Sequence, residues 1–253
     1  MTRRRFFVPS DAIQNDIARL PEDQSHHLRD VLRIDEGETV EIFDGEGLGY
    51  TGTGAFHNSE VTVRHLEKLP SMEPDLPLVL AAALIKPSKF EWMLQKATEL
   101  GVCEIIPIQT RRGEIRMPQI KTDQKRNRWT RIVQEASKQC GRHAFPRIRH
   151  SVDYMDLLYH EEFADFSRLA FYERADELWR PEMLKPRANG VLLFVGPEGG
   201  WETGEIDAAV AAGVRIASLG PWTLRAETAS IAAVSIIQHH IHLLARISDR
   251  NNS

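Results

Sequence analysis

Two loops rich in glycine are the clearest sign of a binding site in this sequence. An apolar run at residues 191–195 leads straight into Gly196-Pro197-Glu198-Gly199-Gly200, and a second run ends at Leu219-Gly220, shortly before Arg225. Small residues at the carboxyl ends of parallel strands let backbone N–H groups approach a ligand closely. We therefore expect the two loops to form one pocket if their strands are neighbours. Neither loop has the spacing of a Walker A motif or a dinucleotide fingerprint, which disfavours a P-loop ATPase.

Charged side chains in or beside these loops could carry chemistry. Glu198 and Glu227 are carboxylates that can accept a proton, and Arg225 is a cation that can stabilise negative charge developing on a substrate. Glu227 has a second explanation, because it stands at the start of an expected helix, where the helix dipole favours a negative charge. His239 and His242 are three residues apart, but no carboxylate or cysteine joins them at ligand spacing, so we expect no metal.

Basic residues are concentrated in one segment of a slightly acidic chain. From Arg111 to Arg149 there are twelve Lys or Arg and three acidic residues, a net charge of +9, whereas the rest of the chain carries −13. Such a segment can attract phosphates locally although the whole protein carries −4. A second basic cluster comprises Arg3, Arg4, Arg5, Arg29 and Arg33. The alternative for either set is an ordinary solvated surface.

The hydrophobic pattern predicts two domains that must position these residues. Residues 1–70 predict a small β-rich domain, with turn signals between its short strands and one helix at about residues 25–32. Residues 71–77 form a linker, since three prolines fall within residues 70–77. Residues 78–253 alternate apolar strands with helices, which predicts an α/β domain whose mostly parallel sheet is covered on both faces. The expected strands lie at residues 6–8, 39–43, 50–56, 60–69, 78–84, 102–108, 147–151, 168–172, 191–196 and 214–219.

Besides a helix that follows Thr203, three expected helices flank the second group of strands. The first runs from Pro87 to Gly101, with Ser88 and Glu91 at the spacing of a capping box. The second lies in the basic segment and ends at Gly141, and the third follows Glu227.

Composition excludes several classes of protein. No apolar stretch approaches the roughly 20 residues needed to cross a bilayer, and the N-terminus lacks the apolar core of a signal peptide. Two cysteines, Cys103 and Cys140, give neither a disulfide framework nor a metal-binding spacing. These features predict a cytoplasmic protein without a membrane span.

Four separated motifs resemble one known family. They are Val195 to Gly200 together with Leu219-Gly220 and Leu224 to Ala229; His26 to Arg33; Gln95 to Val102; and Glu135 to Arg142. In this order they resemble the knotted SPOUT methyltransferases and, more narrowly, the ribosomal RNA small subunit methyltransferase E family, which is specific for uridine N3. The resemblance implies an N-terminal PUA-like β-barrel that binds RNA and a C-terminal α/β domain with a deep trefoil knot. It also implies S-adenosylmethionine as cofactor and a homodimer.

The resemblance assigns roles to individual residues. Ribose-methylating SPOUT proteins have an arginine where this chain has Gln95-Lys96-Ala97-Thr98, a departure that fits base methylation. Arg225 is expected to stabilise the uracil anion, and Glu198 or Glu227 to remove the proton from N3. Gly196 and Gly220 are expected to leave room for the adenosine. Cofactor binding is expected from Leu193, Phe194, Gly196, Pro197, Glu198, Gly199, Gly200, Leu219, Gly220, Leu224 and Arg225.

The expected substrate is a uridine of small-subunit (16S) ribosomal RNA, within the assembled subunit. RNA phosphates are expected to contact Arg3, Arg4, Arg5, Arg29, Arg33, Arg126, Arg128, Arg131 and Arg142. Two alternatives remain open on the residues alone. One is a ribosome-assembly factor that binds RNA without catalysis, and the other is an α/β enzyme whose loop at residues 196–200 binds a small phosphorylated metabolite.

Overall fold

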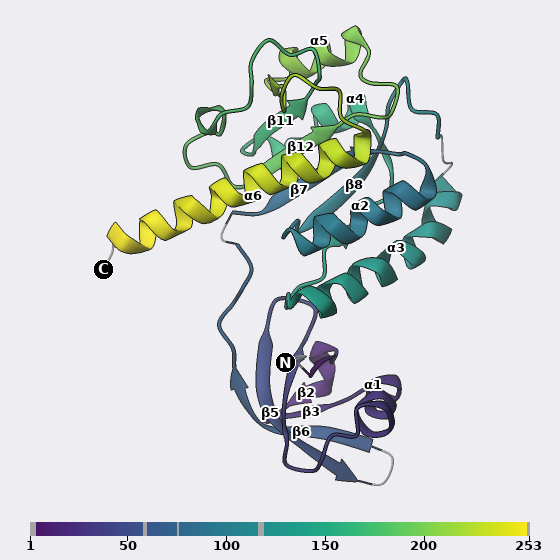
Figure 1. Ribbon diagram of the computed structural model, residues 1–253, viewed down its shortest axis with the longest axis vertical. Coiled ribbons are helices and arrows are strands. Elements are labelled where there is room, and N and C mark those ends of the chain that lie inside the picture. Colours follow the sequence, from purple (N-terminus) through teal and green to yellow (C-terminus); the bar gives the residue numbers. More distant parts are fainter. Residues whose placement is uncertain (1–3, 58–59, 75, 116–118, 252–253) are drawn as a thin grey trace. The chain divides into compact units, whose positions relative to one another are not determined.

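The computed structural model consists of two compact units, each described here by itself (Figure 1). It describes residues 4–57, 60–74, 76–115 and 119–251, with residues 119–123 and 245–251 in backbone only. The first unit comprises Met1–Glu73 and Ser137–Phe145, and the second comprises Pro74–Ala136 and Pro146–Ser253. The chain first passes between units inside the expected linker, and it contributes Ser137–Phe145 to the first unit, which the sequence pattern did not predict.

The first unit is built on a six-stranded sheet in the order β1-β4-β5-β6-β3-β2. β1 pairs with β4 in parallel, and the other pairs are antiparallel. Within the described residues no pairing joins β1 to β2, so the ladder stays open there. Phe6, Ile42 and Val63 form its core with Leu28. The strands are β1 (Arg5–Phe7), β2 (Ile13–Gln14), β3 (Ile17–Arg19), β4 (Thr39–Phe43), β5 (Gly49–His57) and β6 (Glu60–Lys68).

Two parts of this unit differ from the sequence expectation. The hairpin β2-β3 was not predicted, although its two-residue turn, Asn15-Asp16, has both residues at positive φ (49° and 60°), as a type I′ turn requires. The expected helix at residues 25–32 begins earlier, as α1 (Glu22–His26), and continues as a π-helical turn (His27–Val31). A 3-10 turn covers Ser10–Ala12.

Two glycines explain why residues 137–145 belong to the first unit. A Cβ on Gly45 would lie 2.6 Å from the ring of Phe145, and one on Gly49 would lie 2.4 Å from the ring of His143. The missing side chains leave space for both rings. Phe145 packs against Phe7 and Phe43, with ring centroids 4.9 and 5.6 Å apart, and its N–H donates to the Gly45 carbonyl at 2.8 Å. Aromatic packing therefore fastens this distant segment to the sheet.

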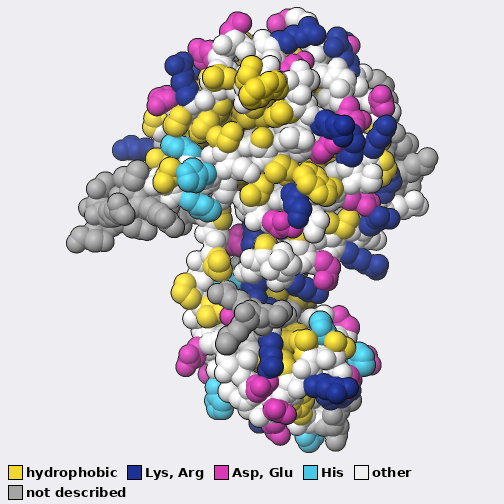
Figure 2. Space-filling model, in the orientation of Figure 1, with side chains coloured by type: hydrophobic (Ala, Val, Ile, Leu, Met, Phe, Trp, Pro, Cys, Tyr) yellow, Lys and Arg dark blue, Asp and Glu magenta, His cyan; other side chains and the backbone are white. Residues whose placement is uncertain are grey.

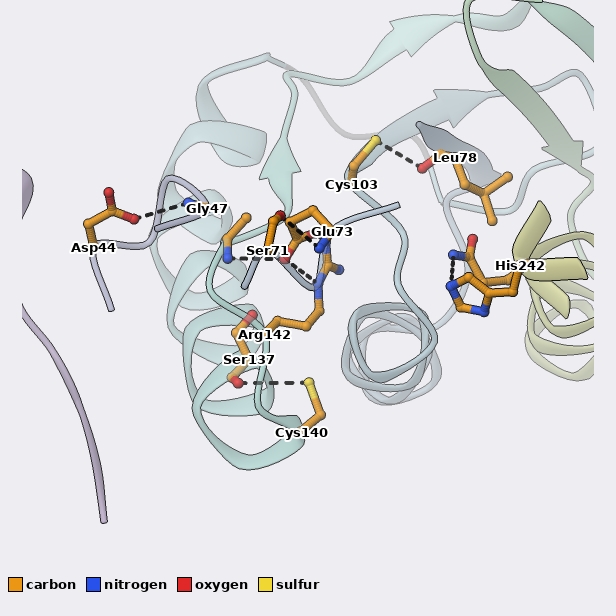
Figure 3. Close-up of polar contacts among 12 residues, drawn as sticks. Asp44, Gly47, Ser71, Glu73, Leu78, Cys103, Ser137, Cys140, Arg142 and His242 are labelled. Atoms are coloured by element: carbon orange, nitrogen blue, oxygen red, sulfur yellow. Dashed lines mark hydrogen bonds and ion pairs between the residues drawn. The ribbon is translucent and has the colours of Figure 1, made fainter. Parts of the chain in front are cut away.

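An ion pair completes the attachment of residues 137–145. The Arg142 side chain, only 9% exposed, donates to both carboxylate oxygens of Glu73, and the Ala144 N–H donates to Glu73 Oε1 at 3.2 Å (Figure 3). The Arg142 carbonyl accepts a hydrogen bond from Arg5 at 3.2 Å. A buried ion pair of this kind is costly to break, because one charge would remain without a partner.

The second unit confirms the expected α/β architecture. Its seven strands are all parallel, in the order β10-β8-β7-β12-β11-β13, with β9 also paired to β8. The sheet therefore brings β12 beside β7, although more than a hundred residues separate them in the chain. The strands are β7 (Leu78–Ala83), β8 (Glu104–Gln109), β9 (Arg147–Ile148), β10 (Val152–Asp153), β11 (Ser167–Phe171), β12 (Val191–Val195) and β13 (Arg215–Ala217).

Helices cover both faces of this sheet, as predicted (Figure 1). α2 (Pro87–Glu99), α6 (Ala226–Asn251) and part of α3 (Gln119–Cys140) pack on one face. α4 (Tyr154–Leu158) and α5 (Thr203–Ala211) pack on the other. Successive side chains of a strand point to opposite faces of the sheet, and helices cover both faces. Nearly every position of β7 and β12 is therefore apolar. Two 3-10 turns lie at Glu161–Phe163 and Pro181–Met183.

The start of α2 corrects the expected capping box. Lys86 is the N-cap, Pro87 is the first helical residue, and no side chain caps the helix. Ser88 therefore lies inside the first turn instead of before it. Proline is favourable at this position because its missing N–H would have no partner there in any case.

Among the described helices none is long and apolar enough to cross a membrane.

Candidate functional site

A cavity of about 170 Å³ lies at the carboxyl edge of the parallel sheet in the second unit. The loops that follow β11, β12 and β13 form its walls, and the start of α6 closes one side. This is the edge at which α/β proteins bind ligands. The lining consists of residues 171–173, 195–201, 218–220, 222–224, Ala226 and Ala229.

The structure brings together most of the predicted cofactor residues. Residues 196–200 line the cavity from one side, and Leu219, Gly220 and Leu224 line it from the other. Three expected residues do not line it: Arg225 lies just outside the lining, and Leu193 and Phe194 are fully buried and pack on opposite faces of β12, in the two hydrophobic cores. The side chains of Leu193 and Phe194 therefore have a core role, because the strand interior is covered by helices on both faces.

The glycines of the cavity have structural reasons of their own. A Cβ on Gly196 would lie 2.9 Å from the indole of Trp201, which is buried and donates its Nε1–H to the Phe171 carbonyl at 2.9 Å. Gly196 thus makes room for a tryptophan of the fold, and its expected role in leaving room for the adenosine stays a prediction. Gly220 meets nothing within 4 Å but has a φ of +142°, a conformation that only glycine adopts readily.

Lys89 links the two candidate carboxylates. Its Nζ donates to Glu198 in the loop after β12 and lies 3.4 Å from Glu227 Oε1 in the first turn of α6. The first turn of α2, the loop after β12 and the first turn of α6 therefore meet around one ammonium group. The sequence pattern did not assign this residue to the site. The available signal was a lysine in the first turn of a helix, where the dipole disfavours a positive charge unless carboxylates compensate.

The ammonium group of this cluster stays charged, and its two carboxylate neighbours differ in their access to the cavity. The hydrogen bond to Glu198, reinforced by Glu227, raises the pKa of Lys89 above its ordinary value, so the lysine stays cationic. The Glu227 side chain is only 12% exposed, and its Oε2 has no hydrogen-bond partner among the described residues. Glu198, which lines the cavity, is better placed than Glu227 to meet a ligand.

A buried carboxylate fixes the glycine-rich loop to its neighbour. Glu205, 1% exposed, accepts hydrogen bonds from the N–H groups of Glu202 and Arg111, both at 2.9 Å. Glu202 and Glu205 form a capping box at the start of α5. The loop after β8 is thereby held against the loop at residues 196–202. Glu205 was also missed, although Glu202-x-x-Glu205 has the spacing of a capping box.

The expected catalytic cation lies at the edge of the cavity. The side chain of Arg225 is exposed, and within the described part of the chain it has no ion-pair partner. Arg225 does not line the cavity itself, but Leu224 before it and Ala226 after it both do. The guanidinium is therefore available to a substrate that approaches from solvent.

The arginines predicted to bind RNA in the first unit divide into two kinds. Arg4 pairs with Glu38, Arg29 pairs with Asp30 at 2.8 Å, and Arg33 is exposed. Arg5 and Arg142 are buried instead: the Arg5 side chain is 3% exposed, pairs with Glu41 and stacks on Phe43. These two are corrected to structural roles, because neither presents its charge to solvent. Arg3 lies outside the described residues.

The basic residues of α3 remain on the surface of the second unit. Arg128 pairs with Glu91 at 2.7 Å and Arg126 contacts His150, while Arg131 is exposed. His239 and His242, the pair considered for a metal, lie on α6, where His242 Nε2 is 3.2 Å from Gln238. The structure contains no group of three or more His, Cys, Asp or Glu that could hold a metal within its described residues.

The sequence matches two known domain families. Residues 72–238 match the RNA methyltransferase domain, and residues 20–53 match the RNA methyltransferase PUA domain. The ribosomal RNA small subunit methyltransferase E of Synechocystis sp. is 32% identical over 241 residues, which are 94% of this chain and 77% of that protein.

Solved structures agree with these matches. A ribosomal RNA small subunit methyltransferase E from Neisseria gonorrhoeae, bound to S-adenosylmethionine, has 27% identity and a TM-score of 0.80 over 94% of this chain and 97% of that one. A chain from Legionella pneumophila, solved with its bound cofactor SAM, has 30% identity and a TM-score of 0.79 over 94% and 98%. The predicted fold class, a knotted SPOUT α/β domain with a PUA-like domain before it, is confirmed.

Proposed function

Because the chain belongs to the ribosomal RNA small subunit methyltransferase E family, we propose that it methylates N3 of a uridine in small-subunit ribosomal RNA, with S-adenosylmethionine as methyl donor. The observation that carries this proposal is the cavity in the matched domain. The two motif loops, which follow β12 and β13, both line it from the same edge of the sheet, although β11 lies between these two strands.

The lining of the cavity fits this cofactor. Val195, Leu219 and Leu224 offer apolar contact to an adenine ring, and the glycine-rich backbone offers close approach. Glu173 and Glu198 add carboxylates that suit the positive charges of a sulfonium and an ammonium group. When bound, S-adenosylmethionine supplies a methyl carbon whose bond to sulfur breaks as the uracil nitrogen attacks it.

The residues of the chain then have to activate uracil N3. Neutral uracil carries a proton on N3, so this proton must leave before the nitrogen lone pair can form the new bond to carbon. Arg225, exposed beside the cavity, is placed to stabilise the resulting negative charge on O2 and O4. Glu198 is the carboxylate that can accept the proton from within the cavity. Lys89 holds Glu198 in position through their ion pair, and the same ammonium group lies 3.4 Å from Glu227.

Two measurements test the function. Isothermal calorimetry is expected to give one S-adenosylmethionine site for each chain. Mass spectrometry of small-subunit ribosomal RNA from cells lacking the protein is expected to show one N3-methyluridine missing, restored by the gene on a plasmid. RNA binding without cofactor binding would instead identify a ribosome-assembly factor without catalysis.

We expect α3 to contact RNA phosphates through Arg126, Arg128 and Arg131. Replacing all three with Glu should weaken RNA binding and flatten its salt dependence. The slope of log affinity against log salt should change by about 0.9 for each phosphate that the protein no longer neutralises. Filter binding at several salt concentrations measures this slope, and calorimetry should show unchanged cofactor affinity. An unaltered slope would contradict the assignment of α3.

The family also leads us to propose a homodimer that acts in the cytoplasm on assembled small subunits. α6 supports the dimer, because it exposes three large apolar side chains, Ile236, Leu243 and Leu244. Exposed apolar residues on one element are typical of association surfaces. Multi-angle light scattering is expected to give twice the chain mass of 28.8 kDa. An active protein that remains monomeric at working concentration would overturn the dimer.

A further inference from the structure

Trp222 is the most exposed large hydrophobic side chain that the structure describes, at 79%. It lines the cavity with Thr223 and Leu224, and Figure 2 shows hydrophobic side chains exposed over the loop that joins β13 to α6. The other tryptophan of the cavity, Trp201, is 3% exposed and packs against Tyr154 with ring centroids 4.6 Å apart. Trp201 belongs to the core, whereas Trp222 presents its ring to solvent at the cavity.

The loop that carries Trp222 is fixed at its base. The Ser218 hydroxyl donates a hydrogen bond to the Gly220 carbonyl at 2.9 Å and accepts one from the Gly220 N–H at 3.2 Å. The Ser218 N–H donates to the Glu177 carbonyl at 2.7 Å, and the Trp179 N–H donates to the Ser218 carbonyl at 3.0 Å. Pro221 restricts the backbone directly before the tryptophan. An anchored loop therefore holds the indole ring of Trp222 in solvent.

Methylation at N3 creates a need for such a ring. N3 lies on the Watson–Crick edge of uracil, so a paired and stacked uridine cannot present it to the methyl donor. Enzymes that modify a base take it out of the stack and hold it against aromatic or apolar side chains. Stacking on an aromatic ring together with a nearby cation is typical of single-stranded nucleic acid binding. Trp222 and Arg225 supply this pair of groups within one loop.

We infer that Trp222 is the stacking platform for the methyl-accepting uracil, once that base has left the RNA stack. The inference rests on the proposed function and adds a substrate-binding residue to it. We assign the cofactor to the interior of the cavity, between residues 196–200 and 219–220. The exposed ring of Trp222 is then available to contact the uracil base.

Steady-state kinetics on small ribosomal subunits that lack the modification test this inference. Trp222→Ala should raise KM for the subunits about tenfold, in the range measured for loss of base stacking on an aromatic ring. Trp222→Phe should restore most of the affinity, since phenylalanine keeps an aromatic face. Calorimetry should give an unchanged dissociation constant for S-adenosylmethionine. Trp92→Ala is the matched control, because Trp92 is 45% exposed on α2 and does not line the cavity.

A direct measurement uses tryptophan fluorescence with S-adenosylhomocysteine present. A 15-nucleotide single-stranded RNA with one central uridine should quench the wild type more than the Trp222→Phe protein, and an abasic ribose at the centre should abolish that difference. An unchanged KM for Trp222→Ala would overturn the inference while leaving the proposed function intact. Weakened cofactor binding with an unchanged KM for RNA would overturn it in favour of stacking on adenine. Failure of the proposed function would appear separately, as a wild type that does not methylate the subunits.

Discussion

Replacing Arg225 with alanine is expected to lower kcat about 100-fold while leaving the affinity for S-adenosylmethionine unchanged. Removal of one group that stabilises developing charge typically costs about 10²–10³ in rate. The side chain is exposed and has no ion-pair partner among the described residues, so its loss should not destabilise the fold. Single-turnover methylation of small subunits separates the chemical step from binding, and calorimetry reports the cofactor.

Arg215 provides the control for this substitution. It is an exposed arginine on β13, of the same residue type and close in sequence, but it does not line or border the cavity. Arg215→Ala should retain wild-type turnover. If Arg225→Ala also retains it, the stabilisation of the uracil anion has been assigned to the wrong residue, although the cavity would stand as the cofactor site.

Breaking the ion pair between Glu73 and Arg142 should have the largest effect on stability. Glu73→Gln leaves the guanidinium of Arg142 buried, at 9% side-chain exposure, without its carboxylate. Loss of one partner of a buried pair costs about 3–5 kcal/mol, and we expect about 3 kcal/mol because Glu73 is itself 21% exposed. Thermal and urea denaturation followed by circular dichroism measure the loss, which should concern the first unit.

An exposed pair supplies the comparison. Arg180 Nη2 lies 3.3 Å from Glu177 Oε1, and more than half of each side chain is exposed. Glu177→Gln should therefore lower the free energy of unfolding by less than about 1 kcal/mol. Equal effects of the two substitutions would show that burial does not govern the Glu73 pair. The double variant Glu73→Leu with Arg142→Met should recover much of the loss, because it leaves no uncompensated charge.

The two arginines illustrate how identical residue types diverge in one chain. Arg142 lies just after the end of α3 and Arg225 just before the start of α6, and both belong to motifs that carry the family resemblance. Arg142 faces Glu73 and contributes to stability, whereas Arg225 faces solvent beside the cavity and is free to meet a substrate. The difference is one of surroundings, which a one-dimensional pattern does not contain.

The sequence by itself determined the elements of the second unit and the loops of its site. Apolar runs such as residues 78–84 and 191–196 predicted buried strands, because a parallel strand covered on both faces must be apolar at nearly every position. Glycines after such runs marked the loops at residues 196–200 and 219–220, because close approach of the backbone is a local property of glycine. These predictions needed no knowledge of which strands are neighbours.

Only the tertiary structure decided which of these residues meet. β12 lies beside β7, which brings Glu198 to Lys89 of the helix that follows β7, and the packing of α6 on that helix brings Glu227 there too. The tertiary structure also places Leu193 and Phe194 in the cores instead of the cavity. In the first unit it places Arg5 and Arg142 in the interior. Strand order, knotting and long-range ion pairs depend on contacts between residues far apart in the chain. Local propensity and periodicity indicate which element a segment forms and which of its faces is apolar. They carry no information about which other part of the chain will cover that face.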